Sequence, residues 1–176
     1  MSVAELLKRI GAVKFGEFVL SSGKKSNVYV DLRKLPSYPE AFREIVWAMA
    51  ERAGKIDFDL VCGVAVGGLP LATAVAYEMG KPLIYVRKER KEHGTKKIIE
   101  GDFKPGAKVL VVDDVATTGG SILRAVNALR SAGLVVEHAL VVVDRLEGAE
   151  GALRRAGVML LSLVTLKDLI GGGAGG

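Results

Sequence analysis

The chain has 176 residues, of which 49% are apolar, which is enough for one well-filled core but short for two. Its formal charge of +5 suits a polyanionic partner, yet the basic residues concentrate only in Arg87 to Lys97, so a small phosphorylated substrate explains the charge better than a nucleic acid does. No apolar run reaches the roughly 18 to 20 residues of a membrane span, and the N-terminus lacks a signal-peptide apolar region, so we expect a cytoplasmic protein that binds no membrane.

The first part of the chain is predicted to contain a helix, a hairpin and a second helix. Both helices begin at a capping box, in which a serine precedes a glutamate by three residues. These pairs are Ser2 with Glu5 and Ser37 with Glu40, the helices are expected to end near Gly11 and Gly54, and the hairpin is expected between Phe15 and Arg33.

After Asp59 short apolar strands alternate with helices, which is typical of parallel βαβ units. The strands are expected near 59–64, 82–87, 108–113, 135–143 and 158–163, and the helices near 69–79, 121–132 and 149–156. The pattern predicts an α/β fold in which a central parallel sheet is flanked by helices. We expect one domain over residues 1–170, followed by a disordered Gly-rich tail at 171–176. Ligands of such sheets bind at the carboxyl ends of the strands.

Cysteine and histidine offer little chemistry in this sequence. Cys62 lies in an apolar run, where a buried structural thiol is expected rather than a nucleophile or a metal ligand. His93 and His138 are the only histidines, and no zinc motif or P-loop accompanies them, so we expect no metal site built by the protein alone.

The most informative segment is Val109 to Ser121, VLVVDDVATTGGS. An apolar strand is expected to end at Asp113 and Asp114, and a turn rich in threonine and glycine then leads into a helix near Ile122. Successive backbone N–H groups, hydroxyls and the positive end of the helix dipole make this turn a cradle for a phosphate. The two carboxylates suit hydroxyl groups or a cation beside it, so a phosphorylated sugar fits the whole segment. An acidic pair that only caps a helix is the simpler alternative, and it explains less of the pattern.

This segment resembles the signature of the type I phosphoribosyltransferases, which bind 5-phosphoribosyl 1-diphosphate (PRPP) and exchange its diphosphate for a nitrogenous base. The resemblance implies that Asp113 and Asp114 hold the ribose hydroxyls at the catalytic centre and that the turn after them holds the 5-phosphate. The PRPP-binding residues implied here are Asp113, Asp114, Val115, Ala116, Thr117, Thr118, Gly119, Gly120 and Ser121. Mg²⁺ is the implied cofactor, held mainly by the substrate, because this cation prefers phosphate oxygens and water to a protein cage.

A second motif lies between Arg87 and Gly101, a stretch too polar for a core and too long for a tight turn. We expect an exposed, mobile loop over the site, because its first residues leave a strand whose end faces the same crevice as Asp113. A solvated charged loop without a function is the alternative.

This loop resembles the R-K-E-x-K-x-H-G loop of the orotate-specific members of that family. The resemblance implies that four of its residues bind the diphosphate of PRPP, namely Arg87, Lys88, Lys91 and His93. Fixed cations around a leaving diphosphate stabilise charge that grows in the transition state, and Lys91 and His93 are the candidates for assisting its departure. The resemblance also implies a homodimer in which this loop serves the neighbouring subunit.

Two weaker resemblances to the family concern residues that would bind the base. The resemblance implies that Arg145 pairs with the carboxylate of orotate and that Thr117 also contacts it, although an Asp144–Arg145 salt bridge is the structural alternative. Residues from about 1 to 35, together with the C-terminal segment, are implied to form a hood over the base, with Tyr29 near its ring. Many family members carry lysines where this chain has Ser21 and Gly67, and the sequence does not show what replaces those two charges.

The resemblance therefore implies an enzyme that converts orotate and PRPP into orotidine 5-phosphate and diphosphate in pyrimidine biosynthesis. A phosphoribosyltransferase for a purine or for uracil would keep the phosphate contacts and change only the hood. A PRPP-sensing regulator that binds nucleic acid is the second alternative, but the residues before Val13 are too few for a helix-turn-helix module, so no nucleic-acid partner is expected.

Overall fold

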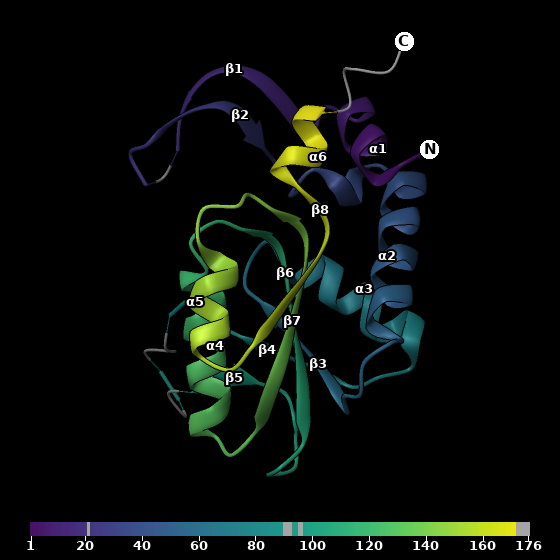
Figure 1. Ribbon diagram of the computed structural model, residues 1–176. Helices are drawn as coiled ribbons and strands as arrows, with labels where there is room; N and C mark the ends of the chain where they lie inside the picture. Colours follow the sequence, from purple (N-terminus) through teal and green to yellow (C-terminus); the bar gives the residue numbers. More distant parts are fainter. Residues whose placement is uncertain (21, 90–92, 95–96, 172–176) are drawn as a thin grey trace.

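A six-stranded sheet forms the centre of the protein, and helices cover both of its faces (Figure 1). The computed structural model describes residues 1–20, 22–89, 93–94 and 97–171. The sheet has the order β5-β4-β3-β6-β7-β8, and its neighbouring strands are parallel except for the pair β4 and β5. Its strands are β3 (Leu60–Val64), β4 (Leu83–Val86), β5 (Ile99–Glu100), β6 (Lys108–Ala116), β7 (Val135–Asp144) and β8 (Met159–Thr165). The predicted α/β class is confirmed.

The remaining elements comprise a hairpin and the covering helices. The hairpin is formed by β1 (Val13–Val19) and β2 (Lys25–Val30). The helices are α1 (Val3–Arg9), α2 (Pro39–Ala53), α3 (Leu69–Met79), α4 (Gly120–Ser131), α5 (Ala149–Arg155) and α6 (Leu166–Gly171), with the 3-10 helix η1 (Leu35–Ser37) before α2. None of these helices is long and apolar enough to cross a membrane. The Gly-rich tail is predicted to start at residue 171, whereas Gly171 is the last residue of α6. Residues 172–176 lie outside the described part of the chain.

Two cores form on the two faces of the sheet because successive strand residues point to opposite sides. In β6, Leu110 and Val112 join the core beneath α2 and α3, whereas Val109 and Val111 join the core beneath α4 and α5. All four side chains are buried. The uninterrupted apolar run of this strand thus follows from burial on both faces.

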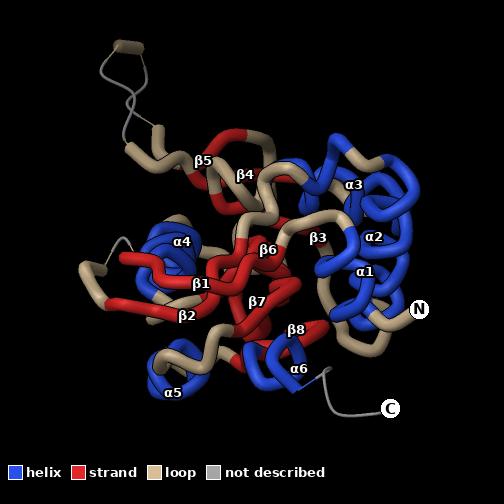
Figure 2. The backbone as a smooth tube through the Cα atoms, turned by 90° about the horizontal axis from the view of Figure 1, so that it is seen from above, coloured by secondary structure: helices blue, strands red, loops and turns tan. Residues whose placement is uncertain are grey.

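The centre of the sheet contains a switch in topology, which positions the site. The neighbours β3 and β6 lead through α3 and α4 to β4 and β7, which lie on opposite sides of them. Seen from above, α3 and α4 lie on opposite sides of the sheet (Figure 2). The loops that follow β3 and β6 therefore separate at the carboxyl end of the sheet and leave a crevice between them. The hairpin and α6 lie above this end (Figure 1).

Some boundaries differ from those predicted. The capping box of α1 is present, with the Ser2 and Glu5 side chains each accepting the other's backbone N–H at 3.2 and 2.8 Å. The second box is wrong, because Ser37 ends η1 and α2 begins after Tyr38 without a side-chain cap.

The strand β6 does not end at the acidic pair, as predicted, but continues to Ala116. The ladder with β7 runs on through Asp113, which pairs with Val141, and through Val115, which pairs with Val143. Main-chain pairing with a long neighbouring strand thus extends β6 past its apolar residues. The acidic pair consequently lies on a fixed strand rather than in a loop.

Candidate active site

The acidic pair occupies the carboxyl end of β6, where the two side chains point to opposite faces of the sheet. Asp113 Oδ1 accepts the N–H of Asp114, and Asp114 Oδ1 accepts the N–H of Val115, both at 2.8 Å. Asp114 lies against the loop after β3, next to Gly67, whereas Asp113 lines the cavity at the start of α4. Both carboxyls also line the crevice between the two loops, so the pair can hold two adjacent hydroxyl groups.

Burial raises the pKa of one member of this pair. Asp113 is only 7% exposed. This burial, followed by the neighbouring charge of Asp114, raises the pKa of Asp113 well above its ordinary value. The ionised form of Asp113 is therefore disfavoured relative to that of an exposed carboxyl.

The turn between β6 and α4 has the donors that the sequence predicts for a phosphate cradle. Across the described residues, the backbone N–H groups of Thr117, Thr118 and Gly119 donate no hydrogen bond within the chain. Gly119 has a φ of 89°, in the left-handed region that favours glycine, and it starts the 12-residue helix α4. Unused N–H groups at the positive end of a helix form an anion site.

A cavity of about 320 Å³ lies over this turn. The predicted residues that line it are Asp113, Val115, Ala116, Thr117, Thr118, Gly119, Gly120 and Ser121. Arg124 also lines the cavity and donates to Ser121 Oγ at 3.1 Å, although the sequence analysis missed it. Its position one helical turn after Ser121 is the signal that could have identified it.

The loop after β3 approaches β6 so closely that it has no room for side chains at two positions. A Cβ on Gly68 would lie 2.7 Å from the Val112 carbonyl oxygen and 2.8 Å from that of Val64. A Cβ on Gly67 would overlap the Asp114 carboxylate, with the Asp114 Cγ only 2.8 Å away. The two glycines therefore do more than start a helix, since they bring the backbone against the acidic pair.

A cavity of about 370 Å³ lies beneath the hairpin, and it contains both predicted base-binding residues. It is lined by Tyr29 from β2, by Thr117 from the phosphate turn, by Asp114 and by Arg145. The ring of Tyr29 packs against Phe18 with the centroids 5.5 Å apart. The cavity meets the crevice at Asp114, so a base bound here would lie next to the ribose site.

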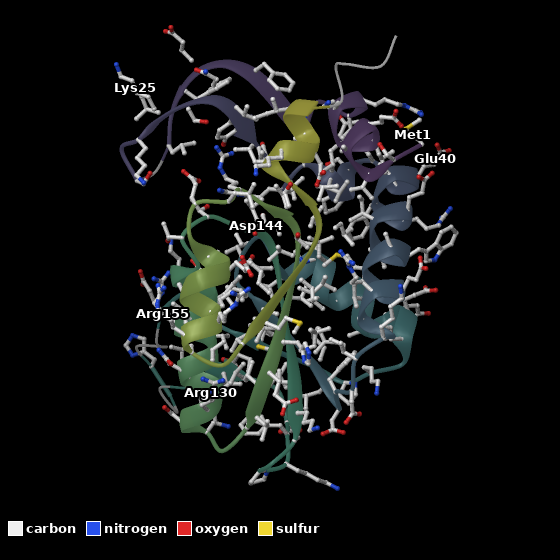
Figure 3. The ribbon with its side chains drawn as sticks, in the orientation of Figure 1. Met1, Lys25, Glu40, Arg130, Asp144 and Arg155 are labelled. Carbon is white, nitrogen blue, oxygen red and sulfur yellow. The ribbon has the colours of Figure 1, made fainter. Side chains whose placement is uncertain are left out.

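Arg145 is 5% exposed and joins the hairpin to the sheet. Its Nη2 donates to Ser26 Oγ at 3.1 Å and to the Val28 carbonyl at 3.0 Å, and its Nε pairs with Glu147 at 3.1 Å. Asp144 instead accepts the N–H of Leu146, so within the described residues no Asp144–Arg145 salt bridge forms. Figure 3 labels Asp144 at the end of the sheet beneath the hairpin. The ion pair between these two described neighbours is therefore not formed, and Arg145 instead has structural partners in the hairpin and in Glu147.

The segment between β4 and β5 contributes its first two basic residues to the crevice. Arg87 and Lys88 line the crevice opposite the phosphate turn. Arg87 Nη1 pairs with Glu100 at 3.3 Å, whereas its buried Nε has no hydrogen-bond partner among the described residues. A buried donor without a partner is expected where a group binds an anion that comes with the ligand.

The rest of that segment differs from the expected open loop. The segment returns to the sheet as β5, which pairs antiparallel with β4 and covers the edge of the sheet. Ile99 of β5 is buried. The described tip of the segment, residues 93–94, is exposed. His93 does not line the crevice or the two cavities of its own chain. The prediction for Lys91 lies outside the described residues.

The single cysteine of the chain, Cys62, is a structural residue. Cys62 is fully buried in β3, and this burial raises its pKa to about 12, which confirms an inert structural thiol. The described ranges contain no group of three or more His, Cys, Asp or Glu side chains arranged for a metal ion.

Comparisons with known proteins agree with this geometry. Residues 35–154 match the family described as the phosphoribosyl transferase domain. The orotate phosphoribosyltransferase of Methanocaldococcus jannaschii is 49% identical over 164 residues, which cover 93% of each chain. The crystal structure of orotate phosphoribosyltransferase from Aeropyrum pernix has a TM-score of 0.85 and 44% identity, and the match covers 97% of this chain and 98% of that one. The Mycobacterium tuberculosis enzyme, solved in complex with PRPP, has a TM-score of 0.76 and 35% identity, with 95% and 96% covered.

Proposed function

The chain belongs to the orotate phosphoribosyltransferases of the phosphoribosyl transferase family, and we propose that each part of its crevice binds a defined part of PRPP or orotate. Enzymes of this family are pentosyltransferases. The reaction transfers the 5-phosphoribosyl group of PRPP to orotate and yields orotidine 5-phosphate and diphosphate, a step of pyrimidine biosynthesis. The observation that carries the assignment of subsites is that an acidic pair, an anion cradle and a base cavity with a buried arginine meet at the end of β6.

The ribose and its 5-phosphate are bound by β6 and the turn after it. Asp113 and Asp114 accept the ribose hydroxyls, and the N–H groups of Thr117, Thr118 and Gly119 donate to the 5-phosphate. The strand fixes the pair and the helix fixes the turn, so the sugar is held at both ends. This arrangement orients C1 toward the base cavity.

Orotate occupies the cavity beneath the hairpin. The Arg145 guanidinium binds the carboxylate of orotate, and Thr117 contacts the same ring from the phosphate turn. Tyr29 covers the ring from the hairpin, which acts as a hood together with α6. Neither a purine nor uracil has a carboxylate for Arg145, which favours orotate over the two alternative bases.

The diphosphate leaves into the crevice lined by Arg87 and Lys88. Their positive charges stabilise the charge that grows on the leaving oxygens. Lys91 and His93, from the same segment of the neighbouring subunit, assist the departure of the diphosphate. Bound Mg²⁺ would neutralise part of the diphosphate charge. The cation would arrive with the substrate and be held mainly by its phosphate oxygens, because the acidic pair orients the ribose and the described residues contain no group of three or more possible metal ligands.

The subunits act as a homodimer in which the segment after β4 serves the neighbouring site. His93 is exposed and lines neither the crevice nor the two cavities of its own chain, which supports this arrangement. Cytoplasmic localisation stays a prediction.

A panel of bases tests the proposed function directly. The purified protein with PRPP and Mg²⁺ should release diphosphate with orotate and not with hypoxanthine, adenine or uracil. Diphosphate release with one of those bases, and none with orotate, would refute the assignment. A protein that bound nucleic acid at physiological salt and had no transferase activity would support the regulatory alternative instead.

The role of the loop is tested by a single variant. Lys91→Ala should lower the rate of the chemical step far more than it weakens orotate binding, because the lysine acts on the leaving group. Rapid-quench measurements with saturating substrates separate these two effects. A variant that lost only orotate binding would contradict the proposed role.

A further inference from the structure

Arg33 lies where the crevice meets the base cavity, and the subsites proposed so far give it no role. It lines both hollows, and it shares this position only with Asp114 and Val115 among the described residues. The bond between C1 and the leaving oxygen must lie at this junction if the ribose is on the acidic pair and the base is beneath the hairpin. A charge here would therefore be close to the reacting atoms.

The backbone around Arg33 is fixed, whereas its side chain is available. The flanking Leu32 and Leu35 are buried, and the N–H of Arg33 donates to Asp31 Oδ1 at 3.2 Å. The next residue is also held, because Lys34 Nζ donates to the Gly11 carbonyl at 3.3 Å. Within the described part of the chain, the exposed Arg33 guanidinium makes no hydrogen bond or ion pair. An arginine with a fixed backbone and an unpartnered guanidinium is free to bind an anion.

Besides Arg33, the crevice is lined by three cations, Arg87, Lys88 and Arg124, and two of them already have partners. Arg87 is partly engaged by Glu100, and Arg124 bonds Ser121 beside the 5-phosphate turn. The loop after β3 cannot carry a cation at Gly67, because a side chain there would displace the Asp114 carboxylate. On the side of the crevice that borders the base cavity, the lining cation is Arg33.

We propose that Arg33 binds the diphosphate of PRPP at the junction with the base cavity and supplies the positive charge that Ser21 and Gly67 do not provide. This inference rests on the proposed function, since it takes the crevice as the diphosphate site. The alternative target of Arg33, orotate, has its carboxylate bound by the buried Arg145 in the same cavity. Diphosphate has the greater charge and lies on the side of the crevice where Arg87 and Lys88 also converge.

The test compares Arg33→Gln and Arg33→Lys with the matched control Arg43→Gln. Arg43 is exposed on α2, lines neither hollow, and has no hydrogen bond or ion pair within the described residues. Titration calorimetry with Mg²⁺ measures the binding of PRPP, diphosphate and orotidine 5-phosphate, and steady-state kinetics measures kcat and KM. Thermal unfolding verifies that each variant is folded.

Arg33→Gln should lower kcat/KM for PRPP by about a hundredfold and weaken PRPP and diphosphate binding by about tenfold. The binding of orotidine 5-phosphate, which has no diphosphate, should change by less than about twofold. Arg33→Lys should recover part of the loss because it keeps the charge. The control Arg43→Gln should behave as the wild type does.

Two results would overturn the inference. One is unchanged binding of PRPP and diphosphate by Arg33→Gln, and the other is an equal loss for orotidine 5-phosphate, which would place Arg33 on the base, the ribose or the fold. A wild-type protein that bound PRPP but did not react with orotate would refute the proposed function. The binding measurements would still decide the role of Arg33 in that case, so the two failures are distinguishable.

Discussion

The loop after β3 and the loop after β6 face each other across the crevice, but they build the site in opposite ways. The loop after β6 contributes groups, namely hydroxyls and unused N–H donors next to the acidic pair. The loop after β3 contributes space, because Gly67 and Gly68 let its backbone lie against Asp114 and the main chain of β6. A binding site thus depends as much on side chains that are absent as on those that are present.

The two loops also differ in how far a substitution should spread. A changed side chain in the loop after β6 affects one contact with the substrate. A Cβ added in the loop after β3 instead pushes two segments of the central sheet apart or displaces a carboxylate. We therefore expect the glycine substitutions to have the larger effects.

Gly68→Ala should have the largest effect of all and should act on stability. The added Cβ would lie within 2.9 Å of the Val112 and Val64 carbonyl oxygens and of the Asp113 Cα, none of which can move without distorting the sheet. We expect a loss of about 3 kcal/mol in the free energy of unfolding, measured by urea denaturation.

The matched control for Gly68→Ala is Gly151→Ala in α5. Its Cβ would meet only Arg155 Nη1, at 3.5 Å, and alanine favours a helix, so a gain of up to about 1 kcal/mol is expected. A Gly68→Ala protein as stable as the wild type would show that the two loops do not differ in this way.

Gly67→Ala should act on activity rather than on stability. Here the Cβ overlaps a side chain, the Asp114 carboxylate, which can rotate away and lose its position for the ribose. We expect kcat/KM for PRPP to fall roughly tenfold to a hundredfold, with less than about 1 kcal/mol lost in unfolding free energy. A full loss of stability with unchanged activity per folded molecule would contradict this division of roles.

Thr118→Val should have a smaller effect, confined to one contact. The substitution removes a hydroxyl from the phosphate cavity and keeps the volume of the side chain. We expect the KM for PRPP to rise about fivefold with little change in kcat. Thr73→Val is the control, because the hydroxyl of Thr73 lies on α3 and donates to the Leu69 carbonyl at 2.7 Å. Equal effects of the two variants would remove the hydroxyl of Thr118 from the proposed site.

Asp113→Asn should alter the dependence of stability on pH. Because burial and the charge of Asp114 raise the pKa of Asp113 in the folded state, this group stabilises the fold at low pH. That contribution is lost as the pH rises from the ordinary pKa of an aspartate through the raised pKa of Asp113. Relative to wild type, the Asp113→Asn protein should therefore be more stable at pH 8 than at pH 4, which means a larger free energy of unfolding. Asp102→Asn, which removes an exposed carboxyl, corrects for the change in net charge, and parallel pH profiles would contradict the prediction.

The sequence by itself determined the features that depend on neighbouring residues. Apolar runs and helical spacing predicted β3, β7 and α3 almost to the residue, because local burial patterns set these elements. The phosphate turn was predicted for the same reason, since its N–H groups, hydroxyls and helix start follow one another in the chain.

Only the tertiary structure decided what depends on segments that are distant in sequence. Pairing with β7 lengthened β6 past the acidic pair, and pairing with β4 formed β5 from an apparently open loop. The close approach of Asp114 explains why position 67 has no side chain, and the path of the chain after the hairpin brought Arg33 to the junction of the crevice and the cavity beneath the hairpin. Such contacts come from packing in three dimensions, which the spacing of residues along one segment does not specify.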